Sequence, residues 1–251
     1  MIAIIRHALL AAAALFFQAF PVTAEELVST IAPELISISS TYSGGSVVAF
    51  GAIQPDQGRS RPYDVVVTVT GPRQSVVARR KERVAGVWLN QASHTFQDVP
   101  SFLGIFANRP FEAIAGADAL HEHRIGLART LVAETDAQEG DPYLTNLIKI
   151  RIEEKLYAEE PKGVTFLSPT AFRVDIPLPQ SVITGDYKVE FKVFSDGVPL
   201  IQKVSHFRVA KVGVEELVIR ASTDYSLLYG LATTLTALMM GWMASIVFRK
   251  D

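Results

Sequence analysis

Absences limit what this chain can do. It contains no cysteine, which excludes disulfide bonds, thiolate metal sites and cysteine nucleophiles and suits a bacterial periplasm as well as a cytosol. It also lacks an excess of charge of one sign, because 24 lysine and arginine residues stand against 26 aspartate and glutamate residues. Nucleic-acid binding needs a basic face, so this near balance argues against it.

Sequence motifs for catalysis are missing too. The chain has no Gly-x-Ser-x-Gly, Walker, dinucleotide-binding or His-Glu-x-x-His motif. We therefore predict a non-enzymatic protein without a cofactor, and we assign no catalytic residue. Catalytic triads are assembled in space rather than in sequence, so a hydrolase with an unrecognised site stays open as an alternative.

One long segment lacks charged side chains altogether. It covers residues 226–248 and is followed by Arg249 and Lys250. A helix of this length spans the roughly 30 Å hydrocarbon core of a bilayer, and a single segment satisfies its backbone polar groups in lipid only as a helix. Tyrosines near one end and a tryptophan near the other suit the two interfaces. We predict a transmembrane helix at residues 225–248 and a tail at residues 249–251.

Residues 1–24 have the features of a secretory signal peptide. A short basic region, an apolar run and the small residues Val22-Thr23-Ala24 follow one another. The alternative is that residues 2–20 stay in the membrane as an uncleaved anchor. Both basic ends then lie on the cytoplasmic side, as the positive-inside rule requires. We predict a single-pass protein of the bacterial inner membrane with residues 25–224 in the periplasm and the C-terminus in the cytoplasm.

Between these ends the sequence is typical of short strands separated by turns. Tyr63–Thr70 is rich in β-branched residues. Residues 185–194 alternate between apolar side chains and the polar set Lys188, Glu190 and Lys192. Their Gly-x-Tyr-x-Val pattern, centred on Tyr187, is similar to strand F of immunoglobulin-like sandwiches, where the tyrosine holds a corner. We predict a mainly β fold, an immunoglobulin-like antiparallel sandwich.

Residues 101–158 depart from this pattern and predict a helical insertion in the sandwich. Asp141 and Pro142 suit an N-cap and a first helical position, and apolar residues then recur at helical spacing. A less regular helix is expected over 118–135. Four phenylalanines are expected to pack the insertion onto the sandwich, with a partner-binding surface as the alternative: Phe96, Phe102, Phe106 and Phe111.

A dense basic run is the first candidate binding site: Arg79, Arg80, Lys81 and Arg83. Residues 75–79 and 84–89 around it predict a hairpin that turns at Arg80-Lys81-Glu82. Guanidinium groups match planar oxyanions bidentately, so the run is a candidate for binding a small anion or anionic lipid. A solvated hairpin tip is the alternative reading.

His121-Glu122-His123 is the nearest approach to a metal motif. On the predicted helix the two imidazoles point about 200° apart, and no third ligand follows in sequence. We predict no metal site here.

Small residues recur every four positions along the predicted membrane helix. Thr233, Ala237, Gly241 and Ser245 form one row, and Gly230 belongs to a second, shorter row. Such spacing lets two helices approach closely in lipid. We expect association with a partner helix, either from a second copy or from another membrane protein, although small residues are also common in membrane helices in general.

Over nearly its full length the chain resembles a family of transmembrane proteins from alphaproteobacteria that has no assigned biochemical function. The resemblance lies in the order of the signal peptide and of six segments: Val47–Gly51, Asp64–Val67, Arg79–Asn90, Val99–Phe102, Gly185–Tyr187 and Tyr229-Gly230. Genes of this family often lie beside a sulfite-exporter-type permease, and the resemblance therefore implies a transport partner. It assigns no residue a role.

The function expected from the sequence is that of a membrane-anchored accessory protein. A periplasmic β domain would be held close to the bilayer to engage a membrane transporter, which the resemblance implies to be a permease of the sulfite-exporter type. The alternative from a different class is a periplasmic domain that binds a small anion or a metal.

Overall fold

The computed structural model describes residues 25–39, 42–55, 61–84, 87–138, 140–211 and 222–247, and the side chains of residues 80–92 are not among those described. The predicted signal peptide and the predicted tail lie outside these ranges. The strands are β1 (Glu26–Ala32), β2 (Leu35–Ile38), β3 (Gly45–Gln54), β4 (Asp64–Thr70), β5 (Arg73–Val84), β6 (Val87–Pro100), β7 (Leu103–Ala107), β8 (Tyr157–Glu160), β9 (Val164–Phe166), β10 (Ala171–Leu178), β11 (Gly185–Ser195) and β12 (Val198–Lys211). The helices are α2 (Phe111–Ile114), α3 (Ala117–Glu122), α4 (Leu127–Glu134), α5 (Pro142–Glu153) and α7 (Ser226–Val247).

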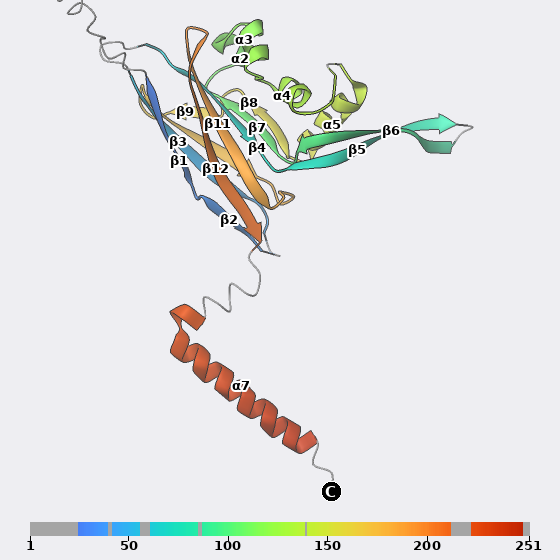
Figure 1. Cartoon of the computed structure of the whole chain (residues 1–251), viewed down its shortest axis with the longest axis vertical. Helices are drawn as coiled ribbons and strands as arrows, with labels where there is room; N and C mark the ends of the chain where they lie inside the picture. Colours follow the sequence, from blue (N-terminus) through green and yellow to red (C-terminus); the bar gives the residue numbers. More distant parts are fainter. Residues whose placement is uncertain are drawn as a thin grey trace, which may run out of the picture.

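The described strands form two sheets and a separate hairpin (Figure 1). The smaller sheet has the order β1-β3-β10-β9 and is antiparallel throughout. The larger sheet has the order β2-β12-β11-β4-β7-β8; its central pairs are antiparallel, and only its two outermost pairs, β12–β2 and β7–β8, are parallel. The mainly β fold predicted from the sequence, with helices inserted between strands and one apolar C-terminal helix, is confirmed.

The core lies between the two sheets, where alternate residues of each strand point inward. From β3 these residues include Val47 and Ala49, and from β11 they include Val189 and Phe191, all fully buried. The Phe172 ring of β10 lies 6.1 Å from the Phe191 ring, centroid to centroid, and so joins the two sheets.

The corner predicted at the start of β11 forms as expected. The Tyr187 ring is buried and stacks on Phe207 of β12 at 4.9 Å. Its hydroxyl donates a hydrogen bond of 2.8 Å to the carbonyl oxygen of Ile183, four residues upstream. Burial raises the pKa of Tyr187 to about 12.

Strand β4 is buried on both faces because a layer of helices covers the larger sheet. Val65, Val67 and Val69 are paired with the inward-pointing residues of β11 and face the other sheet. The alternate residues of β4 point to the helical layer, in which Leu120 and Leu131 are buried. A strand that reads as a continuous β-branched run is thus explained by cover on both sides.

Helices α2 to α5 lie within residues 111–153, inside the predicted insertion of 101–158. The first part of the predicted insertion, Leu103–Ala107, is a strand instead. The predicted cap of α5 is present, since the Asp141 carboxylate accepts a hydrogen bond from Tyr143 N at 2.8 Å with Pro142 at the first turn. The helix expected over 118–135 is divided into α3 and α4. The four insertion phenylalanines are all buried, as predicted.

The hairpin of β5 and β6 extends away from the two sheets (Figure 1). Its turn is not at Arg80-Lys81-Glu82, as predicted, because β5 continues to Val84 and β6 starts at Val87. The basic run therefore lies inside β5, with a register shift between Arg80 and Lys81, and not at a tip. The prediction of the turn was wrong because a run of consecutive charged residues was read as a turn, whereas a two-stranded ribbon also accommodates it.

Helix α7 is apolar and exposed along its whole length. Among the described residues it is the one helix long and apolar enough to cross a membrane. Leucine, methionine and tryptophan side chains such as Leu238, Met239 and Trp242 are each more than half exposed. Such a surface is stable in lipid and costly in water.

Candidate functional site

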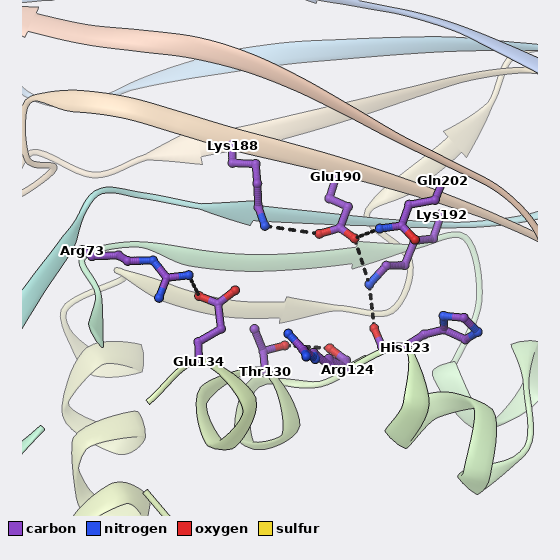
Figure 2. Close-up of polar contacts among 9 residues, drawn as sticks. All are labelled: Arg73, His123, Arg124, Thr130, Glu134, Lys188, Glu190, Lys192 and Gln202. Carbon is purple, nitrogen blue, oxygen red and sulfur yellow. Dashed lines mark hydrogen bonds and ion pairs between the residues drawn. The ribbon is translucent and has the colours of Figure 1, made fainter. Parts of the chain in front are cut away.

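A cleft lined by polar residues alone lies between the larger sheet and the helical layer. We call it the polar cleft (Figure 2). It has a volume of about 240 Å³. Its lining residues are Thr68, Thr70, Glu122, His123, Arg124, Thr130, Glu134, Lys188, Glu190, Lys192 and Gln202.

The strand register explains why polar residues collect at this position. On the face toward the helices, Glu190 of β11 is paired with Thr68 of β4, and Thr68 with Ile105 of β7. The neighbouring row runs from Lys192 through Val66 to Ala107. In both rows the residue on β11 is charged and the residue on β7 is apolar. The cleft lies at the boundary between these two parts of the face.

Glu190 is the centre of a charged network on the sheet side of the polar cleft. Lys192 Nζ lies 3.3 Å from Glu190 Oε1, and Lys188 Nζ lies 3.5 Å from Glu190 Oε2. Gln202 Nε2 donates to Glu190 Oε1 at 2.6 Å. Lys192 also donates to the carbonyl oxygen of His123 at 2.6 Å, which ties the sheet to the helical layer. Only 8% of Lys192 is exposed, so this pair is desolvated more than a surface ion pair.

The opposite wall is built at the end of helix α3. Arg124 has a left-handed backbone with φ of 55°. Its N–H bonds to His121 O at 3.1 Å, and the N–H of Ile125 bonds to Leu120 O at 2.8 Å. These two bonds make a Schellman motif, and the buried Leu120 and Ile125 supply its hydrophobic contact.

Thr130 and Glu134 of α4 complete this wall. Thr130 Oγ1 donates to the carbonyl oxygen of Arg124 at 2.7 Å and holds the left-handed residue in place. Glu134 is paired with Arg73, which lies 3.1 Å away and comes from β5. Figure 2 shows both contacts. The cleft therefore depends on β5, β11, α3 and α4 together.

Thr68 and Arg124 line the polar cleft with polar groups that have no partner among the described residues. The hydroxyl of Thr68 is buried and makes no hydrogen bond. The guanidinium of Arg124 makes no hydrogen bond or ion pair within the described ranges, although the residue is exposed. Unpartnered groups of this kind can bind a polar ligand.

Metal binding finds no support in the part of the chain that the structure describes. No group of three histidine, aspartate or glutamate side chains there has the spacing of a metal site. The ring of His123 instead packs edge-on against Phe194 at 5.8 Å.

The basic run predicted as an anion site is not part of the polar cleft. Arg79 is exposed on β5 opposite Ser93 and borders a groove between β5 and α5. The side chains of Arg80, Lys81 and Arg83 lie outside those described. Their role in anion or lipid binding stays a prediction.

The small-residue rows of α7 lie on an open surface. An added Cβ at Gly230 or Gly241 would meet no atom within 4 Å. Thr233 Oγ1 donates within the helix, to Tyr229 O at 2.9 Å, so its hydroxyl is satisfied without a partner helix. Helix association through Gly230, Thr233, Ala237, Gly241 and Ser245 stays a prediction.

A second concave surface lies at one edge of the sandwich, beside β8. We call it the acidic groove; it has a volume of about 1180 Å³. Its lining includes apolar side chains from both sheets, such as Leu178, and Ile152 from the end of α5. Four exposed carboxylates stand along it against a single lysine, Lys155: Glu153, Glu154, Glu159 and Glu160. Glu154 is paired with Arg151 at 3.0 Å, and Glu159 Oε1 accepts a hydrogen bond from Leu127 N.

Sequence reasoning missed the polar cleft although it recorded the residues of one wall. Lys188, Glu190 and Lys192 were expected only as the face opposite the core. Alternation of polar and apolar residues indicates an exposed strand face. No local sequence feature indicates that residues 122–134, at the end of α3 and in α4, cover part of this face. The left-handed Arg124 gives no sequence signal at all.

A comparison with protein families gave a match over most of the chain. The family described as "Putative transmembrane protein (Alph_Pro_TM)" matches residues 26–250. The chain belongs to this family. The match covers both the β domain and α7, and it confirms the resemblance found in the sequence.

Other comparisons add little. The search of curated proteins gave no match. Among solved structures, AggA, the major subunit of aggregative adherence fimbriae type I from Escherichia coli, is similar over 76% of this chain and 97% of its own, with 12% identity and a TM-score of 0.29. That likeness is too slight to bear on fold or function. Membership of a transmembrane family, together with the apolar α7, supports a membrane-associated protein.

Proposed function

We propose that the chain is an inner-membrane-anchored periplasmic protein that serves as a non-enzymatic partner of a membrane transporter, with a sulfite-exporter-type permease as the leading candidate. The observation that carries this proposal is α7, an apolar helix exposed along its length and joined to a well-packed β domain. The basic residues at both ends, Arg6 and the pair Arg249-Lys250, support the orientation by the positive-inside rule.

The tether gives the mechanism. A domain held to the bilayer by a short connection meets a membrane target at an effective concentration in the roughly millimolar range. A modest intrinsic affinity is then sufficient for stable engagement, and no catalytic step is required. The packed core between the sheets would keep the docking surface rigid.

We place the docking surface at the acidic groove. Glu153 and Glu160, whose carboxylates have no partner among the described residues, favour an extended segment of the transporter that carries basic side chains. The exposed Ile152 in the lining would hold the segment by burial of its apolar side chain.

In vivo crosslinking with mass spectrometry tests this function, with full-length protein compared with a chain that ends at residue 224. We expect one membrane protein to be crosslinked by the full-length chain and at least about ten-fold less by the truncated chain, given the loss of effective concentration. Equal crosslinking of the two chains, or crosslinks to soluble proteins alone, would refute the tethered role.

Charge reversal tests the docking surface within the anchored protein. Glu153→Lys with Glu160→Lys should remove the crosslink, since both carboxylates are exposed in the acidic groove. Glu34→Lys is the matched control, because Glu34 is exposed and lies outside the groove. If the control and the double variant lose the crosslink equally, the groove is not the docking surface.

A further inference from the structure

With Arg73, which pairs with Glu134 from outside the lining, the polar cleft has four cationic groups and three carboxylates. Lys188 and Lys192 share the single carboxylate of Glu190. Glu134 is neutralised by Arg73 at 3.1 Å. On the opposite wall Arg124 adds a guanidinium, and the remaining carboxylate, Glu122, is exposed on the helical side. One carboxylate between two ammonium groups leaves positive charge that an anion would balance.

Arg124 occupies a backbone position that favours glycine. The residue after a helix C-cap in a Schellman motif is usually glycine, because a Cβ is unfavourable in the left-handed region. Strained positions of this kind cluster at ligand sites. The long cationic side chain of Arg124 is therefore kept at a cost to backbone conformation, and it ends in a guanidinium with no partner among the described residues.

A second Schellman motif with a cationic residue in the left-handed position ends α5. Lys155 has φ of 60°, its N–H bonds to Ile152 O at 2.9 Å, and the N–H of Leu156 bonds to Arg151 O at 2.9 Å. A cation at a helix C-terminus is favourable by itself. Lys155 lies in the acidic groove and not in the polar cleft, so it separates that effect from ligand binding.

Thr68 provides an independent indication of a ligand. It is 4% exposed, it lines the polar cleft, and its hydroxyl has no hydrogen-bond partner among the described residues. A buried hydroxyl without a partner is costly. In the strand register Thr68 is paired with Glu190, and the residues two positions away on β4, Thr70 and Val66, are paired with Lys188 and Lys192.

We propose that the polar cleft binds a small oxyanion, a carboxylate or an inorganic anion of the phosphate or sulfate type. The anion lies between the Lys188–Lys192 pair and the Arg124 guanidinium, and the Thr68 hydroxyl donates to it directly or through one water. This site is distinct from the docking surface and does not rest on the proposed transporter partner.

The volume restricts the ligand to a small one. About 240 Å³ is below the roughly 300–1,000 Å³ of pockets that hold drug-sized ligands. A cleft of this size favours an inorganic oxyanion or a short dicarboxylate. Arg124 is exposed at the mouth, so exchange with solvent needs no opening of the fold.

Calorimetric titration of the purified full-length protein in detergent tests the proposal, with sulfate, phosphate and succinate as probes at constant ionic strength. At least one probe should bind with a dissociation constant at or below the millimolar range. Arg124→Gly should weaken it roughly ten- to hundred-fold, the effect of losing one charge-assisted contact. Because glycine suits the left-handed backbone, the Tm of this variant should equal or exceed that of the wild type.

Lys155→Gly is the matched control, since it makes the same substitution in the same motif outside the cleft. It should leave the affinity unchanged. Lys188→Met should also weaken binding at least ten-fold, and Thr68→Val roughly two- to ten-fold without loss of stability. Titration in nanodiscs with and without phosphatidylglycerol distinguishes a free anion from a lipid phosphate, which would compete.

Two results would overturn the proposal. One is that none of the three probes binds at millimolar concentration, either in detergent or in nanodiscs without phosphatidylglycerol. The other is that Arg124→Gly and Lys155→Gly change the affinity equally, which would assign the Arg124 side chain to the helix end alone. If Arg124→Gly does not fold, the Lys188→Met titration decides in the same way.

Discussion

Gly51 of β3 is the position at which a single methyl group is expected to disturb the core most. It is paired directly with Phe172 of β10, and the Phe172 ring lies over it. A Cβ added at Gly51 would lie 2.1 Å from Phe172 Cζ and 2.5 Å from Cε1. Carbon atoms in contact are about 3.5–4.0 Å apart, so the ring would have to move by at least about 1.4 Å.

Neighbouring rings leave Phe172 little room to move. Phe172 is fully buried, and its ring lies 6.0 Å from that of Phe166 and 6.1 Å from that of Phe191. Overpacking of a core costs roughly 1–3 kcal/mol, and alanine recovers about 0.5–1 kcal/mol over glycine in a strand. We expect Gly51→Ala to lower the free energy of unfolding by about 1–2 kcal/mol, a decrease in Tm of roughly 2–8 °C for a domain of this size.

A double-mutant cycle in full-length protein, followed by near-ultraviolet circular dichroism, gives the assay. Phe172→Ala alone should cost about 3–5 kcal/mol. In that background Gly51→Ala should be neutral or stabilising, because the ring it would strike is gone, giving a coupling of about 1–3 kcal/mol. If Gly51→Ala leaves the wild-type Tm unchanged, or costs the same in both backgrounds, the ring does not lie over the glycine and the packing described for the core is wrong.

The remaining predictions concern alkaline stability and the membrane helix. Burial raises the pKa of Tyr187 to about 12 and also raises that of Tyr157, whereas an unfolded chain releases these protons near pH 10. The stabilisation is therefore complete below about pH 10 and is lost as the pH rises toward 12, by about 1.4 kcal/mol per unit for each tyrosine. Denaturant titrations at several pH values between about 10 and 12 give the unfolding free energy as a function of pH. This free energy should fall less steeply with pH in Tyr187→Phe than in the wild type; an equal dependence on pH would contradict the assignment. In a membrane two-hybrid reporter of α7, Gly241→Leu with Ala237→Leu should abolish the association signal expected from small-residue packing, and an unchanged signal would remove that prediction.

The features that sequence reasoning predicted correctly are those with local causes. The β-branched run of β4, the corner at Tyr187 and the cap at Asp141 each depend on residues within a few positions of one another. The apolar α7 belongs to the same class, because length and composition alone decide it.

The features that it missed depend on contacts between distant segments. The parallel pairing of β8 with β7 joins residues about fifty positions apart and has no local signal. The predicted helix over 118–135 breaks where Arg124 and Gly126 have positive φ, and arginine in that conformation is not expected from propensity. The polar cleft depends on this helix break, since it forms where the end of α3 meets the charged face of β11.

A pair of reporter fusions tests the anchored topology most directly. The account predicts that alkaline phosphatase joined after residue 215 is active outside the cytoplasm, and that a green fluorescent protein joined after Asp251 fluoresces inside it. Reversed activities, or release of the full-length protein from vesicles by carbonate washing, would contradict it.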